Sequence, residues 1–515
     1  MRIGVAVSGG GHRATAWALG TLAALVETGA NAQVVSVSSV SGGSIANGAV
    51  AKAGDFGTRQ DSEAFARKIA PTLRVVARDG LFFPGLATRT YVLGALGWLG
   101  LTLLAVFGLA GAVIAAGREN ALAGYALGGA VLGAVLGWKL GGIVRKPRVV
   151  LAVAVAVIAG LMTWGGAALT GGLHGRGLLA TLGVLGAAWL VSWWVAIVLL
   201  SMRGKAVERA FGSVLFAHPT TGRPLTLAEV ASRVNHVMCA TDLESGDQFY
   251  LAPKFLYGFR EGITTAAPSE VTLAAAVQAS AALPGAFPPS VIATGGFTRD
   301  DSVTIPAHPP DRVILSDGGV YDNMADQWEG GLAQRLTVCR QLEAIQEPAD
   351  VLVVANASED WEWNPFTARS RLGRELLGLQ RDQGVQYDVS TARRRARLLR
   401  RPHDDAGRVG PAGVIVMVDR SPVTLSEPFS HGDDEIAARA REALTFVLEQ
   451  HSGPEWDAMA KRNAVVGTAL AAIGAEPTLD LMEHAYTSTV VGLYVLHDIG
   501  KLTPFPRGLY AETMR

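Results

Sequence analysis

The chain has 515 residues, enough for more than one domain, and its 45 basic residues are balanced by 45 acidic ones. A chain without net charge has no global basic field to attract a polyanion, so a nucleic-acid partner is not expected. Only two cysteines occur, Cys239 and Cys339, which argues against a fold organised by disulfides and favours a reducing compartment.

The N-terminal 55 residues repeat one local pattern. Residues 2–8 form an apolar run that reads as a core strand rather than a signal peptide, and helical spacing of apolar residues follows over 13–28. A second β-branched run, 34–40, precedes Ser41-Gly42-Gly43 and an alanine-rich helix. Strand, turn and helix twice in succession predict a parallel α/β sheet.

Positive mean hydropathy arises mostly from one stretch of the chain. Four nearly uncharged runs of about 20 residues or more, the thickness of a bilayer core, cover 91–114, 121–144, 149–169 and 178–200. They predict a four-helix transmembrane insertion within an α/β domain. The expected organisation is a first part of the α/β domain at 1–85, the membrane helices at 86–202, and a second part of that domain with a helical C-terminal extension at 203–515.

Soluble patterning resumes after residue 203. Strands are predicted at 236–240, 313–316, 351–355 and 414–418, and helices at 272–282 and about 433–450. A basic run, Arg393-Arg394-Arg395-Ala396-Arg397 with Arg400 and Arg401, is interpreted either as a solvated helix face or as a surface for anionic lipid headgroups.

Ser41 lies directly between a predicted strand and a helix that begins Gly42-Gly43. A nucleophile on such a sharp turn is exposed at the edge of the sheet, and the N–H groups of the next helix face the charge that develops. The pattern Ser39-Val40-Ser41-Gly42-Gly43 departs from G-x-S-x-G at its first position.

Gly9-Gly10-Gly11 follows the first predicted strand, and successive glycines leave several backbone N–H groups free to face an anion. That anion is an oxyanion in one interpretation and a dinucleotide pyrophosphate in the other, because Gly9-x-Gly11-x-x-Ala14 fits the dinucleotide fingerprint. The dinucleotide interpretation expects an acidic residue at the end of the second strand, where the sequence has Ser38-Ser39-Val40-Ser41.

Asp317 ends a predicted strand and precedes Gly318-Gly319. A carboxylate at this edge accepts the serine proton if the two groups meet. Asp322, five residues further along, is the nearest competing base, and the strand-end position favours Asp317.

Together these motifs resemble those of patatin-like phospholipases. The segments that carry the resemblance are Ser8-Gly9-Gly10-Gly11-His12-Arg13-Ala14, Val40-Ser41-Gly42-Gly43-Ser44, Asp317-Gly318-Gly319, 240–246 and 279–289. The first two look closest to the cytosolic phospholipase A2 branch, and Ser39 and Ala14 each replace a motif glycine. The resemblance covers roughly 1–55 and 230–325.

The resemblance implies a three-layer α/β hydrolase with a Ser–Asp dyad and no catalytic histidine. Ser41 would attack the ester of a membrane lipid, Asp317 would take its proton, and Gly9, Gly10 and Gly11 would bind the oxyanion. Arg13 would stabilise that loop or bind a lipid phosphate, and His12 would be a non-catalytic loop residue. No metal or cofactor is needed, and protein partners are not indicated.

Two other classes of function stay open at this point: a lipid acyltransferase that uses the same acyl-serine, and a non-catalytic lipid-binding membrane scaffold. For either enzyme, an even number of spans puts Ser41 and Asp317 on one side of the membrane. Positive residues mark the cytoplasmic side, and they concentrate on the soluble side of the predicted spans at Arg89, Arg145, Lys146, Arg148, Arg203, Lys205 and Arg209. The hydrolase domain is therefore expected on the cytoplasmic face of the plasma membrane.

Overall fold

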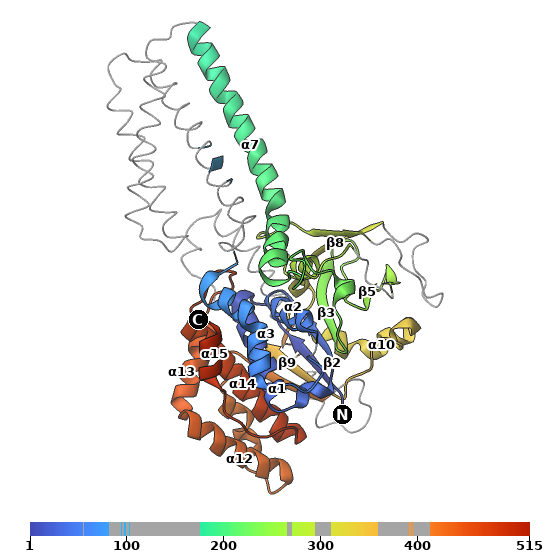
Figure 1. Cartoon of the computed structure of the whole chain (residues 1–515), viewed down its shortest axis with the longest axis vertical. Coiled ribbons are helices and arrows are strands. Elements are labelled where there is room, and N and C mark those ends of the chain that lie inside the picture. Colours follow the sequence, from blue (N-terminus) through green and yellow to red (C-terminus); the bar gives the residue numbers. More distant parts are fainter. Residues whose placement is uncertain are drawn as a thin grey trace, which may run out of the picture. The chain divides into compact units, whose positions relative to one another are not determined.

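The computed structural model describes residues 1–54, 56–81, 94, 97–98, 102, 176–264, 270–293, 311–358, 391–392, 394 and 412–515. The chain divides into two compact units, one formed by Met1–Thr88 with Gly204–Arg515 and the other by Arg89–Arg203. The first unit is a mixed α/β structure around a central sheet (Figure 1).

The sheet has ten strands. They are β1 (Ile3–Val7), β2 (Val34–Ser39), β3 (Asn235–Asp242), β4 (Gln248–Ala252), β5 (Phe255–Gly258), β6 (Gly262–Thr264), β7 (Ser290–Ala293), β8 (Arg312–Asp317), β9 (Val351–Asn356) and β10 (Ala412–Met417). Their order is β10-β9-β1-β2-β3-β4-β5-β6, and β8 pairs with both β3 and β7.

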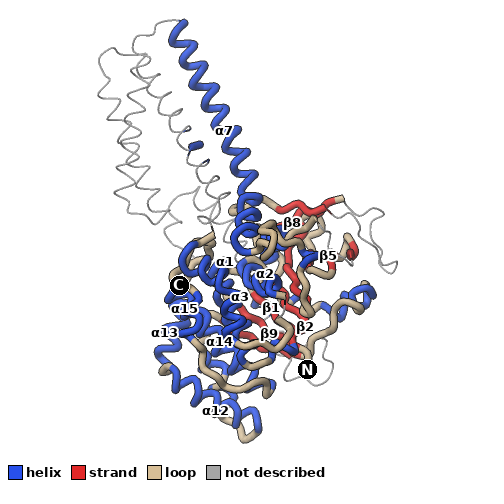
Figure 2. Tube along the Cα trace, viewed as in Figure 1, coloured by secondary structure: helices blue, strands red, loops and turns tan. Residues whose placement is uncertain are grey.

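The sheet is parallel only in part. β10, β9, β1, β2 and β3 run parallel, as the strand–turn–helix pattern predicts, and β1, β2 and β9 lie side by side in Figure 2. From β3 onward every pairing is antiparallel, which corrects the expectation of a parallel sheet. Short connections such as 243–247 between β3 and β4 explain the change, because a parallel crossover needs a dozen residues or more.

The described helices are α1 (Gly11–Glu27), α2 (Gly42–Ala53), α3 (Ser62–Arg74), α7 (Arg176–Ala210), α8 (Leu273–Ser280), α9 (Gln327–Gly330), α10 (Leu332–Val338), α12 (Glu435–Gln450), α13 (Gly453–Ala464), α14 (Ala475–His497) and α15 (Arg507–Thr513). The C-terminal helices α12 to α15, drawn in orange to red in Figure 1, form an extension around α14.

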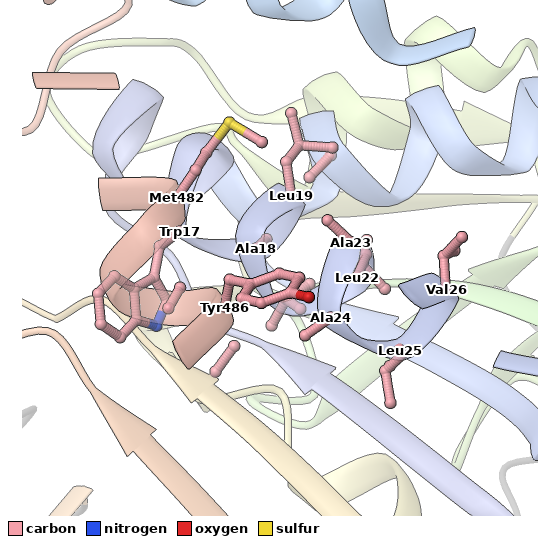
Figure 3. Close-up of a cluster of buried hydrophobic side chains, with 14 of the residues drawn as sticks. Trp17, Ala18, Leu19, Leu22, Ala23, Ala24, Leu25, Val26, Met482 and Tyr486 are labelled. Atoms are coloured by element: carbon pink, nitrogen blue, oxygen red, sulfur yellow. The ribbon is translucent and has the colours of Figure 1, made fainter. Parts of the chain in front are cut away.

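One face of the sheet is covered by α1 and α14. Figure 3 shows Trp17, Leu19 and Leu22 of α1 beside Met482 and Tyr486 of α14, all fully buried. The backbones approach so closely that a Cβ on Gly20 would lie 2.4 Å from the Met482 carbonyl oxygen.

The opposite face of the sheet is covered by a thinner layer. Val354 and Ile415 point to this side and pack in one cluster with Met324, Trp328 and Leu332, which belong to α9, α10 and the turn before them. Helices, sheet and this second helical layer make three layers, so the first unit has the α/β arrangement that the sequence predicts.

In the unit Arg89–Arg203, the predicted spans 91–114, 121–144 and 149–169 lie outside the described residues, apart from isolated positions in the first. The fourth, 178–200, lies within α7. Among the described residues one helical stretch, Leu190–Leu215, is long and apolar enough to cross a membrane, which by itself is weak support. A four-helix transmembrane insertion is thus not shown.

Candidate active site

Ser41 and Asp317 meet because two strands end head to head along β3. β2 pairs with the first half of β3 in parallel and ends at Ser39, opposite Met238. β8 pairs with the second half of β3 in the antiparallel direction and ends at Asp317, opposite Ala240. The two strand ends therefore point at each other, two residues apart along β3. Gly318 permits this approach, because a Cβ there would lie 2.2 Å from the Cys239 carbonyl oxygen.

The Ser41 backbone is held in a conformation that non-glycine residues rarely adopt, with φ 52° and ψ −119°. Such a conformation costs of order 1–3 kcal/mol and persists only when the surroundings enforce it. Here the Ser41 N–H donates to the Ser280 carbonyl (3.1 Å), and α2 begins at the next residue. This is the geometry of a strained nucleophile turn between a strand and a helix.

Asp317 is buried, and burial raises the pKa of its carboxyl to about 6. Hydrogen bonds from the Gly319 N–H, at 2.7 Å, and from the Ser41 side chain oppose that rise in pKa. Its Oδ2 atom nevertheless makes no formed hydrogen bond, so the contact with Ser41 is not a fully aligned bond. Hydrogen bonds between a catalytic base and its partner often align only when substrate binds.

The glycine loop differs from the prediction at Gly9. The Gly9 N–H donates to the Asn323 carbonyl at 3.0 Å, so it is not available to an oxyanion. The N–H groups of Gly10 and of Gly11, the first residue of α1, have no backbone acceptor among the described residues. A Cβ on Gly42 would lie 2.0 Å from the Gly11 carbonyl oxygen, so the glycine loop and the Ser41 turn are in direct contact.

Arg13 is fully buried and anchors the glycine loop rather than facing a ligand. Its Nε donates to the Ala357 carbonyl at 2.9 Å and its Nη1 to the Val466 carbonyl at 2.5 Å. These contacts support the loop-stabilising alternative and count against binding of a lipid phosphate. His12 is also buried, with Nδ1 2.8 Å from the Ala471 carbonyl, and burial lowers its pKa to about 4.

The competing carboxylate, Asp322, is already committed to other groups. Its Oδ1 lies 2.6 Å from Arg394 Nη1, and its two oxygens accept the N–H groups of Met324 and Gln327. Arg394 also pairs with Asp326 at 3.0 Å. Asp322 is thus part of a structural ion cluster, and Arg394 of the basic run faces these carboxylates instead of a lipid headgroup.

Ser39, which stands where the motif has a glycine, takes part in a network of buried hydrogen bonds. Ser39 Oγ accepts hydrogen bonds from Ser44 and Asn47, both at 2.9 Å, and Ser44 Oγ lies 2.8 Å from Ser280 Oγ. His236 extends the network through Asn47 at 2.7 Å. All five residues are buried, so these bonds fix β2, α2 and α8 around the Ser41 turn.

One residue of the site, Asn323, was not predicted from the sequence. Asn323 ties three loops together: its carbonyl accepts the Gly9 N–H, its Nδ2 donates to Ser358 Oγ at 3.1 Å, and its Oδ1 lies 2.7 Å from where a Cβ on Gly319 would be. Its place six residues after Asp317 was the available signal.

Within the described ranges, no group of three or more histidine, cysteine or carboxylate side chains is placed to hold a metal ion.

Comparisons with known proteins add little to this geometry. No family model matches the chain, and no curated protein matches it in sequence. Among solved structures, the crystal structure of VipD from Legionella pneumophila is similar at 13% identity, over 95% of this chain and 91% of that chain. The TM-score is 0.25, and a likeness at that level carries no argument about fold or function.

The raised pKa of Asp317 makes a prediction about stability. A carboxyl whose pKa rises from 3.8 to about 6 on folding stabilises the folded state below pH 3.8, and this contribution is lost as the pH rises through 6. The Asp317→Asn side chain does not titrate, so its variant lacks this pH dependence. Between pH 4 and pH 8 the free energy of unfolding of the wild type should therefore fall by about 3 kcal/mol relative to that of Asp317→Asn.

Denaturant unfolding at the two pH values measures this difference. Asp350→Asn is the control with the opposite sign, because Arg2 lowers the pKa of Asp350. A difference between Asp317→Asn and wild type that stays constant from pH 4 to pH 8 would show that folding does not raise the pKa of Asp317.

Proposed function

We propose that the chain is a serine lipid acyl hydrolase of the patatin-like phospholipase type, acting on membrane lipids through a Ser41–Asp317 dyad. The observation that carries the proposal is the meeting of a serine on a strained strand-to-helix turn with a buried carboxylate whose pKa is raised to about 6. A base with a pKa near neutrality is ionised at working pH and still readily returns the proton.

In the proposed reaction, Ser41 Oγ attacks the ester carbonyl carbon while its proton passes to Asp317. The N–H groups of Gly10, Gly11 and Gly42 face the oxygen that becomes negative. Collapse of the tetrahedral intermediate releases the lipid alcohol, which takes the proton from Asp317, and leaves an acyl-serine. Water then attacks the acyl carbonyl carbon and gives a proton to Asp317. The bond from that carbon to Ser41 Oγ breaks, Oγ takes the proton back from Asp317, and the fatty acid leaves.

Gly9 and Arg13 have supporting roles in this proposal. The Gly9 N–H donates to the Asn323 carbonyl, and the Arg13 guanidinium donates to the carbonyls of Ala357 and Val466. The loop is thereby fixed before substrate binds, so that less reorganisation is needed as charge develops.

The proposal predicts that Ser41→Ala lowers hydrolysis of phospholipid in mixed micelles by roughly a thousandfold or more, because the covalent step is lost. Release of fatty acid by the full chain is the measurement. Ser213→Ala, at an exposed serine of the same unit, should retain wild-type rates. Equal rates for Ser41→Ala and wild type would remove Ser41 as the nucleophile.

Paired asparagine variants separate the two carboxylates in the same assay. Asp317→Asn should lose hydrolysis while remaining folded, whereas Asp322→Asn should lose stability, because the buried ion cluster of Arg394 with Asp322 and Asp326 loses one of its two carboxylates. Transfer of the acyl group to an added alcohol in preference to water would indicate the acyltransferase instead.

We also propose a multi-pass location in the plasma membrane with the hydrolase unit on the cytoplasmic side. Support comes from the four apolar runs and the distribution of positive residues, and from the exposure of Val191, Trp193, Trp194 and Ile197 on α7. The apolar helical stretch begins at Leu190 in α7 and continues past the end of α7 to Leu215, but Phe211 and Leu215 pack in the core of the hydrolase unit, so the lipid-facing part would end before them.

Cysteine labelling with an impermeant thiol reagent on intact cells tests this location, after Cys239 and Cys339 have been replaced. Cysteines at Asn120 and at Gly175 should both react, and one at Ala206 should react only after the cells are opened. The reverse pattern would overturn the orientation, and reaction at only one of the two outer links would overturn the four-span count.

A further inference from the structure

An exposed apolar surface borders the Ser41–Asp317 site. Four aliphatic side chains leave large fractions of their area exposed: Leu243 50%, Leu283 47%, Val291 56% and Ile314 39%. Large apolar side chains gathered at one place on a soluble surface mark an interaction site more often than isolated ones do. We call these four residues the apolar rim.

Strand register places three residues of the apolar rim side by side. Val291 of β7 lies directly opposite Ile314 of β8, so their side chains share one face of the hairpin. The Leu243 N–H donates to the Ile314 carbonyl at 2.9 Å, which places Leu243 at the next position across the sheet. Val313 and Leu315 alternate with Ile314 and are buried, so the outer face alone carries the rim.

Leu283 connects the apolar rim to the dyad. It follows Ala282, whose carbonyl accepts the N–H of Asp317 at 3.0 Å and the hydroxyl of Ser316 at 3.2 Å. A molecule lying on the rim would therefore reach the loop that touches Asp317.

The surroundings of the rim suit a lipid surface. Pro288, in the loop between Leu283 and β7, packs on α7, because a Cβ on Gly204 would lie 3.2 Å from Pro288 Cγ. α7 contains the stretch that is long and apolar enough to cross a membrane. One exposed cation, Arg312, lies on the same face of β8 as Ile314, two residues away, where anionic headgroups would attract it.

We propose that the apolar rim docks on the surface of a phospholipid bilayer and delivers lipid to the dyad; this rests on the proposed function. Aliphatic side chains on the outer face of the β7–β8 hairpin and on the loop at Leu283 enter the headgroup and acyl boundary, while exposed cations of the unit stay in water. A soluble ester would reach Ser41 without using the rim, and a bilayer lipid would need it.

The first test measures contact directly and does not depend on catalysis. The full chain is reconstituted in vesicles of phosphatidylcholine and phosphatidylglycerol with a fluorophore on a cysteine at Val291, or at Leu448 as the control. Leu448 is 45% exposed and lies on α12, in the C-terminal extension. Brominated acyl chains should quench the Val291 probe and leave the Leu448 probe bright; no quenching at Val291, or equal quenching at both, would overturn the proposal.

The second test uses Val291→Asp, with Leu448→Asp as its matched control. Hydrolysis of vesicle phospholipid should fall by about tenfold in Val291→Asp, since withholding one such side chain from an apolar phase changes binding by at least that factor. Hydrolysis of a short-chain soluble ester should stay at the wild-type rate in both variants. Equal vesicle hydrolysis by Val291→Asp and wild type would contradict docking, whereas a wild-type chain inactive on both substrates would contradict the proposed function and leave the quenching result to decide docking.

Discussion

The candidate site depends on one constraint, the sharing of β3 by two strands that run toward each other. β2 occupies the first half of one side of β3 and β8 occupies the second half, so their last residues meet. Ser41 follows the first strand end and Asp317 is the second. Any shift of register along β3 would separate the two side chains, and a shift of one residue would also turn Asp317 to the other face of the sheet.

Buried polar contacts hold this arrangement against the strain at Ser41. Below the turn, Ser39, Ser44, Asn47 and Ser280 hydrogen bond across β2, α2 and α8. Beside the turn, the loop between α13 and α14 is hydrogen bonded to the glycine loop and the residues after it. Arg13 donates to the Val466 carbonyl, and the His12 N–H donates to the Ala469 carbonyl at 2.8 Å. The C-terminal extension thereby supports the geometry of a site formed far earlier in the chain. Networks of this kind fix a single backbone conformation when every member has a partner.

Local patterns predicted much of the fold. The strands at β1, β2, β3, β8, β9 and β10 and the helices α1, α8 and α12 lie where apolar periodicity and turn residues place them. The antiparallel strands β4 to β7 were not predicted, because short runs in Gly- and Pro-rich sequence carry weak patterns. The position of Ser41 on a turn could be read from its flanking glycines. Two other features could not be read from the sequence: the hydrogen bond from the Gly9 N–H to Asn323, and those from Arg13 to distant carbonyls. These contacts join residues more than 300 positions apart. The strand-end position favoured Asp317 over Asp322, but the ion pair of Asp322 with Arg394 could not be predicted from the sequence.

The central claim is that Ser41 is the residue activated by Asp317. The most direct measurement is to treat the folded full chain with a fluorophosphonate and to map the modified residue by mass spectrometry of its peptides. The account predicts one adduct, on Ser41, formed in wild type and much more slowly in Asp317→Asn. An adduct on another serine, or equal rates of labelling in the two proteins, would contradict it.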